Sequence, residues 1–238
     1  MPRFFAEITQ YPVAVVRDRA SVHHIARVLR MAAGDAIRVR TLDDGYRARI
    51  TAVERFRVWL EITGRDPLED RTAVRVHLGL CLCDFRDWEL ALRLVTELGV
   101  SNVHPVVAER SPVRVVSRER MGRWHAIVME AVKQCGRRTI PIVHEPVCLG
   151  ELAERAAAGW PVRLLAHPDA EIPLEPYGGP EVGVVVGPEG GLTPPETAGL
   201  LEAGFTAVTM GRTTLRTVTA AAAAVGILGQ GGVTPRQS

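Results

Sequence analysis

The fold of this 238-residue chain is decided by the stretch Val182-Gly183-Val184-Val185-Val186-Gly187-Pro188-Glu189-Gly190-Gly191. Its first half is apolar at successive positions, which is typical of a strand buried on both faces of a parallel sheet. Its second half places three glycines and a proline within five residues, which predicts a tight loop directly after the strand. We therefore expect a buried strand whose carboxyl end opens into a glycine-rich loop.

Similar apolar segments occur on both sides of this stretch and alternate with amphipathic segments. Apolar residues at helical spacing predict a helix over Trp88–Leu98 that Gly99 ends, and a second helix over Met121–Cys135. The alternation predicts an α/β domain with a parallel sheet covered by helices on both faces. The predicted strands are Val74–Leu82, Val103–Val107, Ile140–Val143, Val162–Ala166, Val182–Val186 and Phe205–Met210.

A further helix is marked directly after the glycine-rich loop. Thr193-Pro194-Pro195-Glu196 is a capping box with proline at the first helical position, and Gly204 can close the helix. The loop is thereby fixed between a strand and a helix start.

The first 71 residues follow a different pattern, in which short strands are separated by turns. Asp43-Asp44-Gly45 is a hairpin signal, and Ile25, Val28 and Leu29 fall on one face of a helix expected over His23–Met31. The predicted strands are Val13–Val16, Ala36–Arg40, Tyr46–Ile50 and Arg57–Ile62. We expect a small β-barrel or β-sandwich domain at 1–71, a polar linker at Gly64–Arg71, and the α/β domain at 72–238.

Bulk composition excludes several classes of protein. The chain is 47% hydrophobic and 24% charged with a formal net charge of +2, as in globular proteins, and no segment approaches the roughly 18 apolar residues of a membrane span. The N-terminus lacks the pattern of a secretory signal, so we expect a cytoplasmic protein. The four cysteines have no CxxC spacing and predict buried thiols with no metal site: Cys81, Cys83, Cys135 and Cys148.

Three loops follow predicted strands at the edge where parallel sheets bind ligands: Ala166–Asp169, Gly187–Gly191 and Met210–Thr217. The glycine-rich loop lacks both the nucleoside-triphosphate and the dinucleotide glycine spacing, so phosphate is not its preferred ligand. Backbone groups exposed by glycine suit a neutral adenosine carrying an amino-acid tail better. Taken alone, the loop is equally compatible with a simple tight turn.

The order of these features resembles the RsmE family of SPOUT methyltransferases. The glycine loop, a capped helix and a strand precede Gly211-Arg-x-x-Leu-Arg-Thr-x-Thr-Ala220, and the likeness extends over nearly the whole chain. Further matching segments are His24–Arg30 with Gly34-Asp35, Thr96–Val100, Glu109-Arg110-Ser111 and Glu130–Arg137.

This resemblance implies a trefoil-knotted α/β domain that follows a PUA-like β-barrel and forms a homodimer through the knot. It implies S-adenosyl-L-methionine as the cofactor and methylation of N3 of a uridine in 16S ribosomal RNA, free or within the small ribosomal subunit. By the same resemblance, the cofactor site would comprise His167, Pro168, Gly187, Pro188, Glu189, Gly190, Gly191, Met210, Gly211, Leu215, Arg216 and Thr217.

Two of these residues are candidates for catalysis. Arg216 would stabilise charge that develops on the uracil, or it could be a helix-start arginine paired with a carboxylate. Glu189 would accept the proton, or it could hold the loop in shape by accepting backbone N–H groups. We expect RNA contacts from cations and rings that also suit a solvated face or barrel core: Arg3, Phe4, Phe5, His24, Arg27, Arg30, Arg110 and Arg114.

The chain departs from the family pattern in three places: at Val218, in Leu82–Arg86, where the family often reads Lys-Gly-Asp-Arg, and at Leu94, where a lysine is usual. Where the family usually reads Leu-Arg-Thr-Glu-Thr-Ala, this chain has Val218 in place of the glutamate. Two alternatives therefore stay open: a cofactor-binding and RNA-binding homologue with weakened or no turnover, and a SPOUT methyltransferase that acts on ribose 2′-oxygens or on tRNA.

Overall fold

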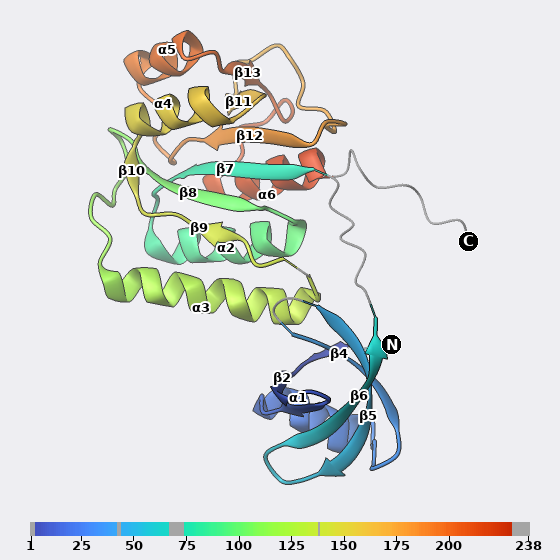
Figure 1. Ribbon diagram of the computed structural model, residues 1–238. Helices are drawn as coiled ribbons and strands as arrows, with labels where there is room; N and C mark the ends of the chain where they lie inside the picture. Colours follow the sequence, from blue (N-terminus) through green and yellow to red (C-terminus); the bar gives the residue numbers. More distant parts are fainter. Residues whose placement is uncertain (1–2, 42–43, 67–73, 138, 230–238) are drawn as a thin grey trace. The chain divides into compact units, whose positions relative to one another are not determined.

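The computed structural model describes residues 3–41, 44–66, 74–137 and 139–229 (Figure 1). The chain divides into two compact units, residues 1–70 with 136–139 and residues 71–135 with 140–238. The expected boundary at residue 71, most of the expected linker and Asp43 of the hairpin signal lie outside the described residues. Gly64 and Arg65, the first two linker residues, instead continue a strand.

The N-terminal unit is a curled six-stranded sheet, which confirms the expected β-barrel. Only Ala6 separates the two edge strands along the chain, and its N–H donates to the Arg40 carbonyl at 2.8 Å. The strand pairs are antiparallel except β1 with β4. In spatial order the strands are β1 (Arg3–Phe5), β4 (Ala36–Arg40), β5 (Gly45–Val53), β6 (Val58–Arg65), β3 (Val13–Val16) and β2 (Glu7–Gln10).

The helical segment of this unit differs from the expected one. Helix α1 (Arg19–His23) begins earlier, where the Asp18 carboxylate accepts the Ser21 N–H at 2.9 Å, and continues as a π-helical turn, η1 (His24–Val28). A π-helical turn winds more widely than an α-helix, so residues at α-helical spacing no longer share a face. Of the three residues expected to face inward, Ile25 is buried, whereas Val28 and Leu29 are 58% and 38% exposed.

The second unit contains a seven-stranded sheet in which every strand pair is parallel, as predicted. The order is β10-β8-β7-β12-β11-β13, and β9 also pairs with β8. The strands are β7 (Arg75–Cys81), β8 (Asn102–Val107), β9 (Ile142–Val143), β10 (Val147–Cys148), β11 (Arg163–Ala166), β12 (Glu181–Val186) and β13 (Thr206–Val208). Strand β12 is the apolar half of the opening stretch, and it lies inside the sheet between β7 and β11.

Helices cover both faces of this sheet, which confirms the expected layering (Figure 1). One face carries α2 (Phe85–Leu98), α3 (Arg118–Cys135) and α6 (Thr217–Gly229), where the rings of Trp88 and Trp124 stack at 3.8 Å between centroids. The other face carries α4 (Leu149–Gly159) and α5 (Pro194–Glu202).

Several local signals of this unit are confirmed, and one prediction is wrong. Gly99 ends α2 with a φ of +111°, and the capping box of Thr193 and Glu196 begins α5. Cys81 and Cys83 are buried, but Cys135 and Cys148 are exposed, because each lies at the end of its helix or strand. Among the described residues, no helix is long and apolar enough to cross a membrane.

Candidate functional site

A pocket of about 440 Å³ lies at the carboxyl ends of strands β11, β12 and β13. The three loops singled out in the sequence form its walls, together with Ala220 of α6. Its volume falls in the range of small-molecule sites, and its lining mixes apolar side chains with backbone and a few charged groups.

Most of the residues expected to bind a cofactor surround this pocket. Those that line it are His167, Pro168, Gly187, Pro188, Glu189, Gly191, Met210, Leu215, Arg216 and Thr217. Gly190 and Gly211 do not line it, which departs from the expected set. The lining also contains residues outside the expected cofactor set. Four of them belong to the loops singled out in the sequence: Ala166, Asp169, Thr213 and Thr214. The others lie outside those loops: Val186, Leu192, Thr209 and Ala220. Most of these adjoin a residue of the expected set, and that adjacency was the signal for them.

The glycine-rich loop is shaped by its own backbone. The Gly191 N–H donates to the Pro188 carbonyl at 2.9 Å, and Gly191 has a φ of +69°, in the left-handed region that favours glycine. At the start of the loop, the Gly187 carbonyl accepts the Thr217 hydroxyl at 3.1 Å. Because Thr217 is the first residue of α6, this hydrogen bond ties two walls of the pocket together.

A neighbouring segment after β8 contacts the outer side of this loop. Arg110 donates from Nη1 to the Gly190 carbonyl at 2.9 Å. The Glu196 carboxylate accepts the N–H of Glu109 at 2.7 Å and that of Thr193 at 2.8 Å. Burial alone would raise the pKa of Glu196, but these two N–H donors lower it overall. Glu196 is therefore a charged carboxylate that joins the segment to the start of α5.

The two expected catalytic side chains, Glu189 and Arg216, both line the pocket and are exposed. Burial, and then the nearby Glu189 carboxylate, raises the pKa of the Cys83 thiol to about 12. Cys83 therefore stays protonated at neutral pH and faces Glu189 as a thiol. Val218 does not line the pocket, and its half-buried side chain packs against the core beneath α6.

The residues expected to contact RNA have varied environments. Phe4 is 7% exposed and belongs to the barrel core, so the alternative of a core ring holds for it and a surface role does not. Phe5 is half-buried beneath the Arg40 guanidinium, at 5.7 Å from its ring centroid, and the side chain of Arg3 is outside the described part. A ring inside a hydrophobic core cannot stack on a base.

The basic side chains of this set that the structure describes are exposed, but His24, Arg27 and Arg30 do not gather on one helical face. His24 and Arg27 lie in η1, whereas Arg30 lies beyond it with a φ of +53°, so the three do not share one helical face. Arg110 and Arg114 donate to backbone carbonyls, of Gly190 and Glu109 respectively. Their guanidinium groups therefore have partners within the protein.

Comparison with known proteins gives matches over both units. The sequence profile of a family described as an RNA methyltransferase domain matches residues 70–229, and that of an RNA methyltransferase PUA domain matches residues 17–63. Among residues 3–41, 44–66, 74–137 and 139–229, no group of three or more His, Cys, Asp or Glu side chains is placed to hold a metal ion.

Curated relatives carry one shared name. The chain is 30% identical to ribosomal RNA small subunit methyltransferase E of Synechocystis sp., over 87% of this chain and 69% of that protein. It is 38% identical to the protein of the same name from Mycobacterium bovis, where the match spans 59% of this chain and 57% of that protein.

Solved structures agree with these matches. The ribosomal RNA small subunit methyltransferase E of Neisseria gonorrhoeae, solved bound to S-adenosyl methionine, superimposes with a TM-score of 0.77 at 30% identity, over 94% of this chain and 95% of that chain. A Legionella pneumophila protein solved with bound cofactor SAM gives a TM-score of 0.76 at 26% identity, over 94% of each chain.

Proposed function

Because the chain belongs to the RNA methyltransferase family that includes ribosomal RNA small subunit methyltransferase E, we propose that it methylates N3 of a uridine in 16S ribosomal RNA, with S-adenosyl-L-methionine as methyl donor. The observation that carries this proposal is the pocket of about 440 Å³, formed by the three loops of the family motif at the carboxyl edge of a parallel sheet.

The residues of the pocket fit this cofactor. Apolar side chains, including Val186, Leu192 and Leu215, suit an adenine ring, and the backbone of Gly187–Gly191 can hydrogen-bond to its edge. Asp169, Thr213 and Thr214 offer polar partners for the ribose and the amino-acid tail. When bound, the cofactor supplies an electrophilic methyl group, and the protein supplies position and polarity.

We assign the remaining chemistry to two side chains of the chain. The uracil N3–H must lose its proton, and Glu189, exposed in the pocket wall, would accept it. Arg216, whose guanidinium is charged at any physiological pH, would stabilise the negative charge that the uracil then carries. The nitrogen lone pair must approach the methyl carbon to roughly 3 Å, so orientation of the base contributes as much as its charge.

The partners follow from the same proposal. We propose that His24, Arg27 and Arg30 contact RNA, because these exposed basic side chains lie close together in sequence on the PUA-like unit. We also propose that the C-terminal segment is knotted, that two subunits pair through it, and that the enzyme works in the cytoplasm, where its substrate is made. Sedimentation equilibrium would test the dimer, and a mass of about 26 kDa would exclude it.

Nucleoside mass spectrometry of small-subunit RNA tests the reaction. We expect N3-methyluridine to be absent from a strain that lacks this gene and to return when the gene is restored. If the mark persists in the deletion strain, the proposed reaction is wrong. Methylation of ribose or tRNA by the purified protein would instead support the alternative substrates, and cofactor binding without any methyl transfer would support the homologue without turnover.

A further inference from the structure

Arg110 lies across from the glycine-rich loop, although 80 residues separate it from Gly190 in the sequence. It belongs to the segment that follows β8, and its guanidinium donates to the Gly190 carbonyl at 2.9 Å. A hydrogen bond from a charged donor is shorter and stronger than a neutral one. The contact therefore fixes a backbone group in a loop that forms a pocket wall.

The stem of Arg110 also packs on the same glycine. A Cβ atom at position 190 would lie 3.3 Å from Cβ of Arg110, tighter than ordinary van der Waals contact, and 3.5 Å from its Cδ, an ordinary contact. The side of Gly190 that would bear a side chain is thus turned toward Arg110, which explains why Gly190 does not line the pocket. Glycine at this position lets the arginine lie against the loop.

A second connection holds the same two segments together. The N–H of Glu109, next to Arg110, donates to Glu196, whose carboxylate also accepts the Thr193 N–H at the start of α5. The segment 187–193 is thus held at three points: Thr217 binds Gly187, Arg110 binds Gly190 and Glu196 binds Thr193. Of these three attachments, that of Arg110 is the one between the two ends of the segment.

We propose that Arg110 is a positioning residue for the cofactor: it holds the Gly190 carbonyl so that the backbone of Gly187–Gly191 keeps the shape of the pocket wall. It acts through the loop and does not contact RNA phosphate, which changes the role expected from its sequence. This inference rests on the proposed function, since the ligand held by the loop is the proposed cofactor.

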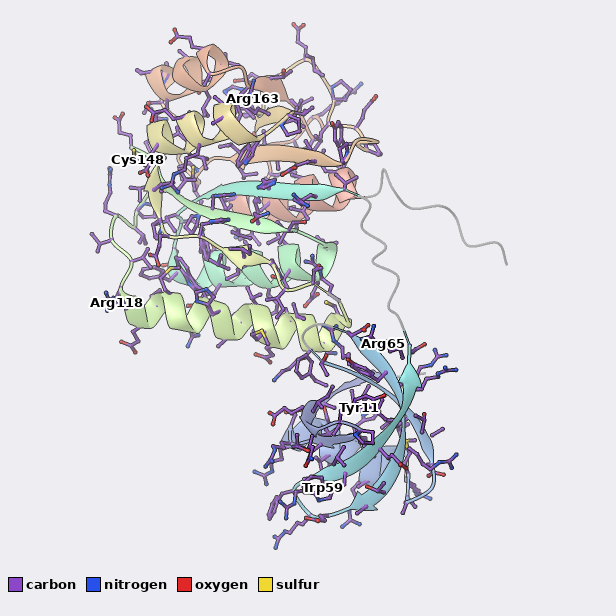
Figure 2. All side chains as sticks on the ribbon, viewed as in Figure 1. Tyr11, Trp59, Arg65, Arg118, Cys148 and Arg163 are labelled. Atoms are coloured by element: carbon purple, nitrogen blue, oxygen red, sulfur yellow. The ribbon has the colours of Figure 1, made fainter. Side chains whose placement is uncertain are left out.

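Binding of S-adenosylhomocysteine, measured by calorimetry, tests the role. Arg110→Met keeps the stem over Gly190 and removes the donors, so we expect Kd to rise about tenfold, as for loss of one net hydrogen bond. Arg110→Lys, which restores a charged donor, should return Kd to within about threefold of the unaltered protein. Arg118→Met is the matched control, because Arg118 is exposed at the start of α3, as Figure 2 shows. An unchanged Kd for Arg110→Met would overturn the proposal.

Hydrogen exchange without ligand separates this inference from the proposed function. We expect the amides of residues 189–193 to exchange about tenfold faster in Arg110→Met than in Arg118→Met, whether or not the cofactor binds. Equal exchange would overturn the role of Arg110, whereas failure of the unaltered protein to bind S-adenosylhomocysteine would overturn the proposed function alone. In steady-state assays the KM for cofactor should rise, and a rise confined to the KM for RNA would mean that Arg110 contacts RNA instead.

Discussion

Strand β12 has a glutamate and a glycine near each end, but the environments of the two ends differ. At the amino end, Glu181 lies 2.6 Å from His77 Nε2 and 3.6 Å from Arg75 Nη1, and the indole of Trp160 covers Gly183. At the carboxyl end, Glu189 is exposed beside the pocket, and the glycines that follow the strand shape its wall. One end satisfies its polar groups within the fold, and the other presents them to a ligand.

Near the amino end of β12 lies His104, the histidine whose pKa is shifted furthest. His104 and His144 stack at 4.1 Å between ring centroids, and His104 Nε2 lies 3.5 Å from His77 Nδ1. Burial, followed by His144, His77 and Arg155, lowers the pKa of His104 to about 3. A shifted pKa is often used to find functional sites, yet here the shift belongs to packing beneath α4, away from the lining of the pocket. The charged side chains that line the candidate site, including Glu189 and Arg216, are exposed instead.

The largest expected effect comes from filling the space at the amino end. A Cβ atom at position 183 would lie 1.9 Å from the Trp160 ring, so we expect Gly183→Val to lower the free energy of unfolding by about 3 kcal/mol or more. Gly191→Ala is the comparison at the other end: its Cβ meets open space, and the φ of +69° alone should cost about 1 kcal/mol. Thermal unfolding of both variants measures the difference, and equal stabilities would contradict this account of β12.

The second-largest effect is expected at the carboxyl end of β12, on turnover and not on the free energy of unfolding. If Arg216 stabilises charge on the uracil, Arg216→Ala should lower turnover roughly 100-fold, with the Kd of S-adenosylhomocysteine within about threefold. Arg212→Ala, in the same loop but outside the pocket lining, is the control and should keep its activity. Full turnover in Arg216→Ala would remove this arginine from the mechanism.

The third prediction is that low pH lowers the free energy of unfolding through His104, near the amino end of β12. The pKa of His104 is about 3 in the folded chain and 6.5 in the unfolded chain, so the unfolded state binds the proton first as pH falls. The contribution of neutral His104 to the free energy of unfolding is fully present above pH 6.5 and is lost as pH falls toward 3. Between about pH 6.5 and 4.5, His104→Phe should therefore lose roughly 2–3 kcal/mol less than the unaltered protein in urea unfolding. If the free energies of unfolding of His104→Phe and of the unaltered protein fall in parallel with pH, His104 takes up its proton in the folded state, contrary to this prediction.

The smallest effect is expected at Val218. Because Val218 packs against the core and does not line the pocket, Val218→Glu should change kcat less than about threefold. Lost apolar contact and a favourable carboxylate at the start of α6 should nearly cancel, within about 1 kcal/mol of stability. A gain in kcat above tenfold would mean that a family glutamate at this position acts in catalysis and that this chain is attenuated.

The sequence predicted those parts whose cause is local. Strands Val13–Val16 and Ala36–Arg40 have the expected bounds because their pattern reflects burial, and the capping box fixes the start of α5. The short strands β1, β2 and β10 and the helices α4 and α6 were missed. Strand β1 has only three residues, too few to show a period, so its pairing with β4 could not be read from the chain.

The candidate site divides in the same way. The strand pattern predicted the three loops, and the family resemblance implied twelve cofactor residues in them, ten of which line the pocket. The environments of Gly190 and Arg110 depend on contact between segments 80 residues apart, and no periodicity records such a contact. The exposure of Val28 likewise depends on a π-helical turn that residue spacing does not reveal.

The hydrogen bond from Thr217 to Gly187 also bears on when the pocket can form during synthesis. Its walls emerge from the ribosome in the order 166–169, 186–192 and 209–220, and the last wall includes the start of α6. Until Thr217 and the helix behind it have been made, the glycine loop lacks the partner that closes its first turn. A nascent chain therefore contains every strand of its barrel, the last of which ends at Arg65, long before the third wall of the pocket has been made.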